Sequence, residues 1–286
     1  MLKINIIGAG LAGSECALYL ANKGYKVDLY DIKTTAKTPA HHSDDFAEIV
    51  CSNSFKSDDE NSASGLFKRE LLALGSKLVE TAYQVKVPAG QALAVDREMF
   101  SSTITNLLKT NKNITIHCQD VADFDSNAIT IVATGPLTTE NMSKALQSKL
   151  GQQFFYFYDA AAPIISAESI NLDKAFFGAR YGKGDDDYLN CPLTKEQYLN
   201  FYHELIKAQR VELHDFEKGN IFESCMPIEI MASRGEDAIR FGPLKPVGFT
   251  NPHDNSKPYA IVQMRKENNC ATMYNILGFQ TNLTFP

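Results

Sequence analysis

Three glycines near the start of the chain have the spacing of a dinucleotide-binding turn. Gly8, Gly10 and Gly13 form a G-x-G-x-x-G motif between the largely apolar run 4–7 and a helix-forming stretch. In such a turn the first glycine permits a tight bend, and the second lets a pyrophosphate approach the backbone. The third lets the helix pack closely on the strand. The phosphates then lie at a helix N-terminus, where unpaired N–H groups and the helix dipole favour negative charge.

An acidic residue follows where the ribose of an adenosine would lie. Asp31 closes the next strand-like run, 26–31, and a carboxylate at this position accepts hydrogen bonds from ribose hydroxyls. The alternative is an ordinary glycine-rich turn between a strand and a helix. Because strand, helix, second strand and acid occur in the required order, the pattern favours an adenine-dinucleotide site.

The elements around this motif alternate between short apolar runs and helical patterns. Alternation of this kind favours βα units and a parallel sheet, so we expect 3–7, 26–31 and 129–133 to lie side by side. The last of these runs ends in Thr134 and Gly135, where small residues would let the strand pass beside a cofactor. Together with the glycine turn, this ending favours FAD over NAD.

The predicted fold class is α/β: a Rossmann-like FAD-binding parallel sheet with an inserted mixed αβ domain. Residues 1–150 would form the N-terminal portion of the FAD-binding domain, and 151–262 an inserted substrate or folate domain. Residues 263–286 would begin the return to the FAD domain. Within the first part, 64–83 has the pattern of one amphipathic helix, and Asp96 has the position of an N-cap for the next helix.

The composition limits the classes of function. The 286 residues are 44% hydrophobic and 22% charged with a net charge of −6, which is typical of a soluble globular protein without a basic field for nucleic acid. No apolar run approaches the roughly 20 residues of a membrane span. The six cysteines show neither a C-x-x-C nor zinc spacing. We therefore expect free thiols and a cytoplasmic protein.

Two further groups of polar residues leave alternatives open. His41 and His42 lie in the long polar connection 33–63, where we favour a role in lining a flavin or folate pocket over metal binding. Four basic residues could contact RNA phosphate or a folate glutamate tail, or could equally be solvated surface groups: Arg180, Lys183, Arg240 and Lys245.

Several long blocks resemble the folate- and FAD-dependent tRNA (uracil-5-)-methyltransferases. They are GAGLAGSE, KTPAHHSDDFAEIVCSNSFKSD, YFYDAAAPI, DYLNCP, CMPIE, RFGPLKPVG and GFQT, and the likeness runs from residue 4 to about 282. The resemblance implies FAD, 5,10-methylenetetrahydrofolate as the one-carbon donor and NADH or NADPH as the reductant. It also implies conversion of an RNA uridine to 5-methyluridine, with tRNA favoured as the substrate. The alternatives are a ribosomal RNA target or an inactive truncated paralogue that binds FAD weakly.

The same resemblance gives two cysteines a chemical role. Carbon 5 of uracil is a poor nucleophile until a thiolate adds at carbon 6, so such an enzyme needs an activated cysteine. The likeness implies that Cys225 in FESCMPIE is this nucleophile, and that Cys51 in VCSNS is a second thiol that removes the proton from carbon 5. We expect the other four cysteines to be core or structural residues.

Members of that family continue for well over a hundred residues beyond the point that corresponds to Pro286. The resemblance implies that this additional segment supplies a second glycine-rich turn to the flavin. For the 286-residue chain we therefore expect substoichiometric FAD and weak or no methyl transfer.

Overall fold

The computed structural model describes residues 3–38, 40–124, 128–135, 137–150, 162–182, 185–210 and 226–284. The described residues form two compact units. The first unit consists of the described residues within 1–50, 57–86 and 95–157, and the second of those within 51–56, 87–94 and 158–286. Each unit therefore combines segments that are distant in the sequence, and each is described separately below.

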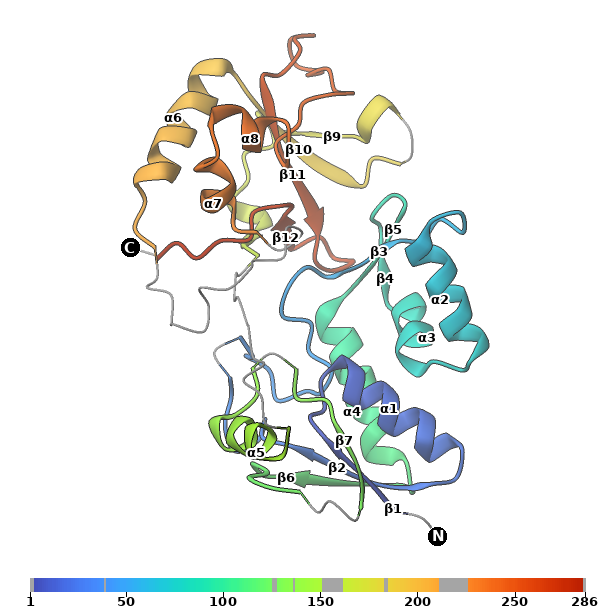
Figure 1. The fold of residues 1–286 in the computed structure, drawn as a ribbon. Helices are drawn as coiled ribbons and strands as arrows, with labels where there is room; N and C mark the ends of the chain where they lie inside the picture. Colours follow the sequence, from blue (N-terminus) through green and yellow to red (C-terminus); the bar gives the residue numbers. More distant parts are fainter. Residues whose placement is uncertain are drawn as a thin grey trace. The chain divides into compact units, whose positions relative to one another are not determined.

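The first unit contains a four-stranded parallel sheet in the order β6-β2-β1-β7 (Figure 1). Strand β1 (Lys3–Ile7) pairs with both β2 (Lys26–Asp31) and β7 (Ile129–Val132), and β2 also pairs with β6 (Ile114–Cys118). The prediction that 3–7, 26–31 and 129–133 share one sheet is confirmed. All carboxyl ends of a parallel sheet meet at one edge, so the glycine turn after β1, Asp31 and Thr134 come together there.

Helices α1 (Leu11–Asn22) and α4 (Arg97–Thr110) pack against this sheet. The buried face of α1 consists largely of small residues, which lets the helix approach the strands closely: Gly13, Ser14, Ala17, Leu18 and Ala21. Asp96 caps α4 as expected, because its side chain accepts a hydrogen bond from the Met99 N–H at 3.1 Å. Helix α5 (Glu140–Leu150) follows β7.

The single helix expected over 64–83 is in fact two helices. Helix α2 (Ala63–Ala73) ends before Gly75, which has a φ of +88°, and α3 (Lys77–Gln84) begins immediately after Ser76. A glycine in the left-handed region ends a helix, and the Ser76 hydroxyl accepts from the Val79 N–H at 3.1 Å to start the next. The hydrophobic periodicity across 64–83 did not predict this break at Gly75 and Ser76.

The second unit is built on a five-stranded antiparallel sheet in the order β8-β12-β11-β10-β9. Its strands are β8 (Ile164–Ser166), β9 (Phe176–Phe177), β10 (Tyr188–Leu193), β11 (Ala260–Lys266) and β12 (Met273–Ile276). The sequence-based boundary at residue 262 falls inside β11. Residues 263–266 and 273–276 therefore belong to this sheet, because β11 pairs with both β10 and β12.

Helices complete the core of the second unit. They are α6 (Lys195–Lys207), α7 (Ile228–Ala232) and α8 (Glu236–Arg240), with two short 3-10 turns, η1 (Ala167–Ser169) and η2 (Arg180–Gly182). Tyr198 of α6 is fully buried and packs in one cluster with Ile228 and Ile239. Thr194 and Gln197 form a capping box at the start of α6.

A third, three-stranded sheet has the order β3-β5-β4, with β3 (Ser54–Ser57), β5 (Ala92–Val95) and β4 (Lys86–Val87). Strand β3 lies within the connection 33–63 for which no regular element was predicted. Among the described helices, none combines the length and the apolar character that crossing a membrane requires.

Candidate dinucleotide site and thiol motif

The glycine turn between β1 and α1 has the geometry that close packing requires. Gly8 has a φ of +99°, and a Cβ at this position would lie 2.6 Å from the Ala133 carbonyl oxygen. A Cβ at Gly13 would lie only 1.8 Å from the Gly8 carbonyl oxygen. Larger residues at either position would push β7 or α1 away from the turn.

Gly10 differs from the other two glycines because it faces open space. Among the described residues, no atom lies within 4 Å of the position that its Cβ would occupy. Gly10 is also the N-cap of α1 and supplies no side-chain hydrogen bond, and the first turn of this helix holds no acidic residue. An open helix N-terminus of this kind fits the pyrophosphate of a dinucleotide.

Asp31 holds the glycine turn at the carboxyl end of β2. Its Oδ2 accepts a hydrogen bond from the Ala9 N–H at 2.6 Å, and its Oδ1 accepts from the Lys33 N–H at 2.9 Å. A carboxylate has about four acceptor positions, so these two bonds leave acceptor capacity for ribose hydroxyls. The position fits the predicted ribose contact and also explains how the turn keeps its shape.

Thr134 and Gly135 follow β7 beside the same turn. The Ala133 N–H donates to the Ile7 carbonyl at 2.7 Å, which aligns the ends of β7 and β1. A Cβ on Gly8 would lie 2.8 Å from the Thr134 Cα, and Gly135 adopts a φ of +68°. The structure thus brings the first glycine of the motif and the end of β7 together, as the expected cofactor contact requires.

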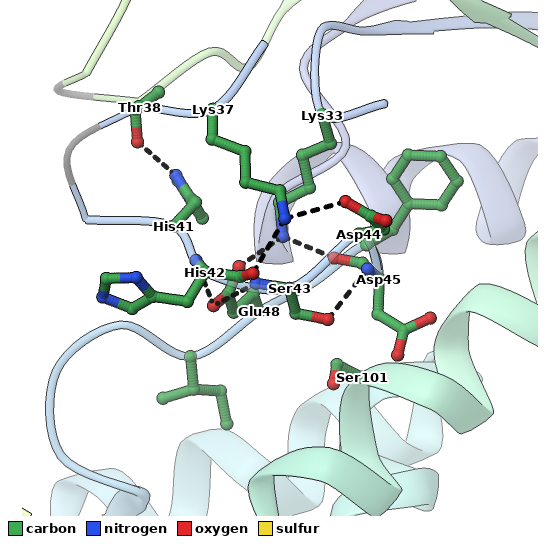
Figure 2. A network of polar contacts seen from close by, with 12 residues as sticks. Lys33, Lys37, Thr38, His41, His42, Ser43, Asp44, Asp45, Glu48 and Ser101 are labelled. Carbon is green, nitrogen blue, oxygen red and sulfur yellow. Dashed lines mark hydrogen bonds and ion pairs between the residues drawn. The ribbon is translucent and has the colours of Figure 1, made fainter. Parts of the chain in front are cut away.

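A buried ion pair supports the segment 41–48 (Figure 2). Lys33 is buried, and its Nζ lies 2.6 Å from Glu48 Oε2 and donates to the Asp45 carbonyl. Glu48 Oε1 accepts from the N–H groups of His42 and Ser43 at 3.0 and 3.2 Å. Burial alone would raise the pKa of Glu48, but hydrogen bonds from Lys33 and these amides lower it below its usual range.

This segment is attached directly to the glycine turn. The N–H of Ala47, a buried residue with a φ of +52°, donates to the Ala9 carbonyl at 2.8 Å. The Phe46 N–H donates to Thr105 Oγ1 of α4 at 2.8 Å. A left-handed conformation at a non-glycine residue costs on the order of 1–2 kcal/mol, so the surrounding contacts must hold it. Sequence reasoning did not single out Lys33, Ala47 or Glu48, because the connection that contains them has no regular pattern.

His41 and His42 lie at the start of the same segment. Burial, with a further contribution from Lys33, lowers the pKa of His41 below its ordinary value, which favours the neutral form of its ring. Its Nδ1 is hydrogen-bonded to Thr38 Oγ1 (Figure 2). Of the residues that the structure describes, no group of three or more His, Cys, Asp or Glu side chains could hold a metal ion.

Of the two candidate catalytic cysteines, the structure describes one. Cys51 is partly buried in the second unit, next to Ser52 and Asn53. Cys225 lies outside the described residues, so the structure gives no distance between the two thiols. The roles of both cysteines stay predictions.

The block that contains Cys225 continues into described residues. Glu229 of α7 is fully buried and accepts from Thr281 Oγ1 at 2.9 Å and from the Asn282 N–H at 2.8 Å. The Ile228 N–H donates to the Gln280 carbonyl at 2.8 Å. The described part of the CMPIE block therefore contacts the GFQT block and the residue after it in the second unit.

Two of the four basic residues singled out above hold loops of the second unit. Arg180 donates to the carbonyls of Lys245 and Val247 at 2.7 and 3.0 Å. Arg240 donates to the Tyr259 carbonyl at 3.0 Å, and its guanidinium lies 3.9 Å from the centre of the Tyr259 ring. Lys245 is exposed, and Lys183 lies outside the described residues.

A parallel sheet whose first strand leads through a tight glycine turn into a helix defines a Rossmann-like α/β protein. A profile of the family described as glucose inhibited division protein A matches residues 3–286, and the chain belongs to this family.

Curated relatives share about half of the residues over almost the whole chain. A protein of Fusobacterium nucleatum is 53% identical and one of Desulfitobacterium hafniense is 52% identical, each over 283 residues or 99% of this chain. Both are named methylenetetrahydrofolate--tRNA-(uracil-5-)-methyltransferase TrmFO. The chain spans about 65% of the length of each of these relatives.

A solved structure resembles the fold at lower identity. Aquifex aeolicus GidA superposes with a TM-score of 0.64 over 98% of this chain and 50% of its own, at 15% sequence identity. At this identity the likeness concerns the fold, and it agrees with the predicted α/β class.

Proposed function

We propose that this chain acts in the methylenetetrahydrofolate-dependent methylation of a tRNA uridine at carbon 5. The observation that carries the proposal is the identity of about 50% to two relatives of that name over 99% of the chain. The name of these relatives specifies tRNA, and this favours tRNA over ribosomal RNA as the substrate. The glycine turn and the CSNS and CMPIE blocks all lie in the matched region.

The residues present fit FAD as the cofactor. Gly8, Gly10 and Gly13 would receive the pyrophosphate at the start of α1, Asp31 would accept from the ribose, and Thr134 and Gly135 would lie near the flavin ring. The fit is supported by the open space at Gly10 and by the acceptor capacity of Asp31. Bound FAD, reduced by NADH or NADPH, would supply the two electrons that bring the one-carbon unit to the methyl level.

The two cysteines would act on the uracil itself. The Cys225 thiolate would add to carbon 6, which makes carbon 5 nucleophilic toward the one-carbon unit. As carbon 5 bonds to the one-carbon unit, the bond of that unit to its folate carrier would break. Cys51 would take the proton from carbon 5, and loss of the Cys225 thiolate from carbon 6 would restore the double bond between carbons 5 and 6. The thiolate that adds is released at the end, so Cys225 is regenerated.

The test follows label from 5,10-methylenetetrahydrofolate into RNA. The purified chain is incubated with excess FAD, NADPH and the labelled folate, with either unmodified tRNA or ribosomal RNA. Because the excess of FAD offsets the weak cofactor binding expected from the sequence, we expect label to enter 5-methyluridine of tRNA, although more slowly than with a full-length relative. Labelling should depend on both FAD and the folate. No label in tRNA above that of Cys225→Ala would contradict the proposed function, and preferred labelling of ribosomal RNA would contradict the tRNA assignment.

A further inference from the structure

The residues that follow Cys51 are fixed by a buried arginine from a distant part of the sequence. Arg265 of β11 is only 4% exposed, and Asn53 is fully buried. The Arg265 guanidinium donates from Nε to Asn53 Oδ1 at 3.0 Å and from Nη2 to the same oxygen at 2.7 Å. Its Nη2 also donates to Ser52 Oγ at 2.8 Å. One side chain therefore holds both residues next to the candidate catalytic thiol.

The contact is reciprocal, which restricts the position of the segment further. Asn53 Nδ2 donates back to the Lys266 carbonyl at 3.2 Å, so the amide both accepts from β11 and donates to it. A planar guanidinium can serve two acceptors at fixed angles, whereas a lysine ammonium is a point charge on a flexible stem. The geometry of Ser52 and Asn53 therefore depends on arginine rather than on positive charge alone.

The strand that carries Arg265 is itself firmly held. Arg265 lies in register with Tyr188 of β10 on one side and with Asn275 of β12 on the other. Nearby, the Tyr188 hydroxyl donates to the Ala89 carbonyl at 2.7 Å, and Asp187 accepts from the Gly90 N–H at 2.7 Å. The segment 51–56 is thus attached to β11, the middle strand of the sheet, and the segment 87–94 to the neighbouring strand β10 and the residue before it.

We propose that Arg265 is the positioning residue for Cys51. It acts through Ser52 and Asn53, whose side chains it fixes, and thereby sets the direction in which the Cys51 backbone presents its thiol. The catalytic meaning of this position rests on the proposed function. The positioning itself is measurable without catalysis, since it determines how readily the Cys51 thiol is reached by a reagent.

The test is the rate at which iodoacetamide alkylates each cysteine of the full chain, resolved by peptide mass spectrometry. Cys118 and Cys270 are exposed and serve as internal references, and Cys191 on β10 reports opening of the sheet. In Arg265→Lys we expect alkylation of Cys51 to rise about tenfold relative to the references, as for the loss of one charge-assisted hydrogen bond. Cys191 should keep its rate.

Two further variants distinguish positioning from general destabilisation. Asn53→Ala should raise Cys51 alkylation to a similar extent, and the double variant should add little, because the two residues act as one unit. Arg240→Lys alters another arginine of the second unit that donates to the Tyr259 carbonyl, and it should leave the Cys51 rate unchanged. If Arg265→Lys also raises the alkylation rate of Cys191, the sheet itself has been loosened. Ser52→Ala, which removes a single hydrogen bond, then decides whether Arg265 positions Cys51.

The proposal would be overturned if Cys51 were alkylated at the wild-type rate in both Arg265→Lys and Asn53→Ala. If Arg265→Lys loosens the sheet, a wild-type rate in Ser52→Ala would overturn it instead. In the methyl-transfer assay Arg265→Lys should lower kcat while the KM for tRNA stays the same, since a misplaced thiol affects the chemical step. Full methyl transfer by Cys51→Ala would instead contradict the proposed role of Cys51 and leave the alkylation result intact. The two failures are therefore distinguishable.

Discussion

At the scale of single residues, glycine is needed at the three positions of the turn for different structural reasons. Gly8 and Gly13 lie where a Cβ would collide with backbone atoms, whereas Gly10 leaves open space at the start of α1. The residue types were evident from the sequence. The hydrogen bond from the Ala9 N–H to Asp31 was not evident from the sequence. Spacing along the chain does not reveal which backbone N–H donates to a given carboxylate.

The proposed nucleophile gives the sharpest prediction at this scale. Cys225→Ala should eliminate methyl transfer to tRNA and leave FAD binding intact, because the thiol is required for addition to carbon 6 and not for cofactor contacts. Label incorporation and flavin fluorescence measure the two properties separately. Transfer by this variant at the wild-type rate would exclude Cys225 as the nucleophile.

Cys51 is predicted to affect the rate in another way. Cys51→Ala should lower kcat by about 100- to 10,000-fold, the range for a positioned acid or base. The matched control is Cys118→Ala, since Cys118 is an exposed thiol on β6 and has no proposed role. Equal rates for the two alanine variants would remove Cys51 from the mechanism.

At the scale of elements, the segment 41–48 and the glycine turn form one structure. Ala47 has a left-handed backbone conformation, and its N–H donates to the Ala9 carbonyl of the turn. The largely buried Lys33–Glu48 ion pair stabilises the same segment. Periodicity could not predict this arrangement, since the segment has no regular pattern. Nor did it predict the break between α2 and α3, which depends on Gly75 and Ser76.

The ion pair should contribute clearly to stability. Lys33→Met leaves the largely buried Glu48 without its charged partner and should lower the free energy of unfolding by about 3 kcal/mol. Lys37→Met is the matched control, because the Lys37–Asp44 pair belongs to the same segment but is exposed, and its loss should cost at most about 1 kcal/mol. Urea unfolding measures both, and equal effects would contradict the structural role of Lys33.

The same pair predicts a pH dependence with a definite sign. The folded-state pKa of Glu48 lies below its ordinary value of 4.5, so its stabilising contribution is present above that value and is lost as the pH falls further. Lys33→Met, which removes the largest of the lowering interactions, should flatten this part of the profile. Urea midpoints between pH 6 and 3 would show it, and parallel wild-type and variant profiles would argue against it.

At the scale of the whole molecule, the sequence predicted the parallel sheet better than the division of the chain. The order of β1, α1, β2 and β7 follows from local patterns that the sequence displays directly. The second unit instead recruits 51–56 and 87–94 through contacts such as Arg265 with Asn53, which join residues far apart in the sequence. A local sequence pattern carries no information on contacts between residues that are far apart in the chain. The end of the inserted domain that we expected at residue 262 therefore lies inside β11.

The central claim is that the glycine turn of the first unit holds FAD, and a fluorescence titration with FAD tests it most directly. The wild-type chain should show saturable binding at one site. Gly10→Val should show none at the same concentrations, because its side chain would fill the space of the pyrophosphate, yet it should melt at the same temperature since that space is otherwise open. Absence of saturable binding by the wild type, or equal affinity in the folded Gly10→Val variant, would contradict the account.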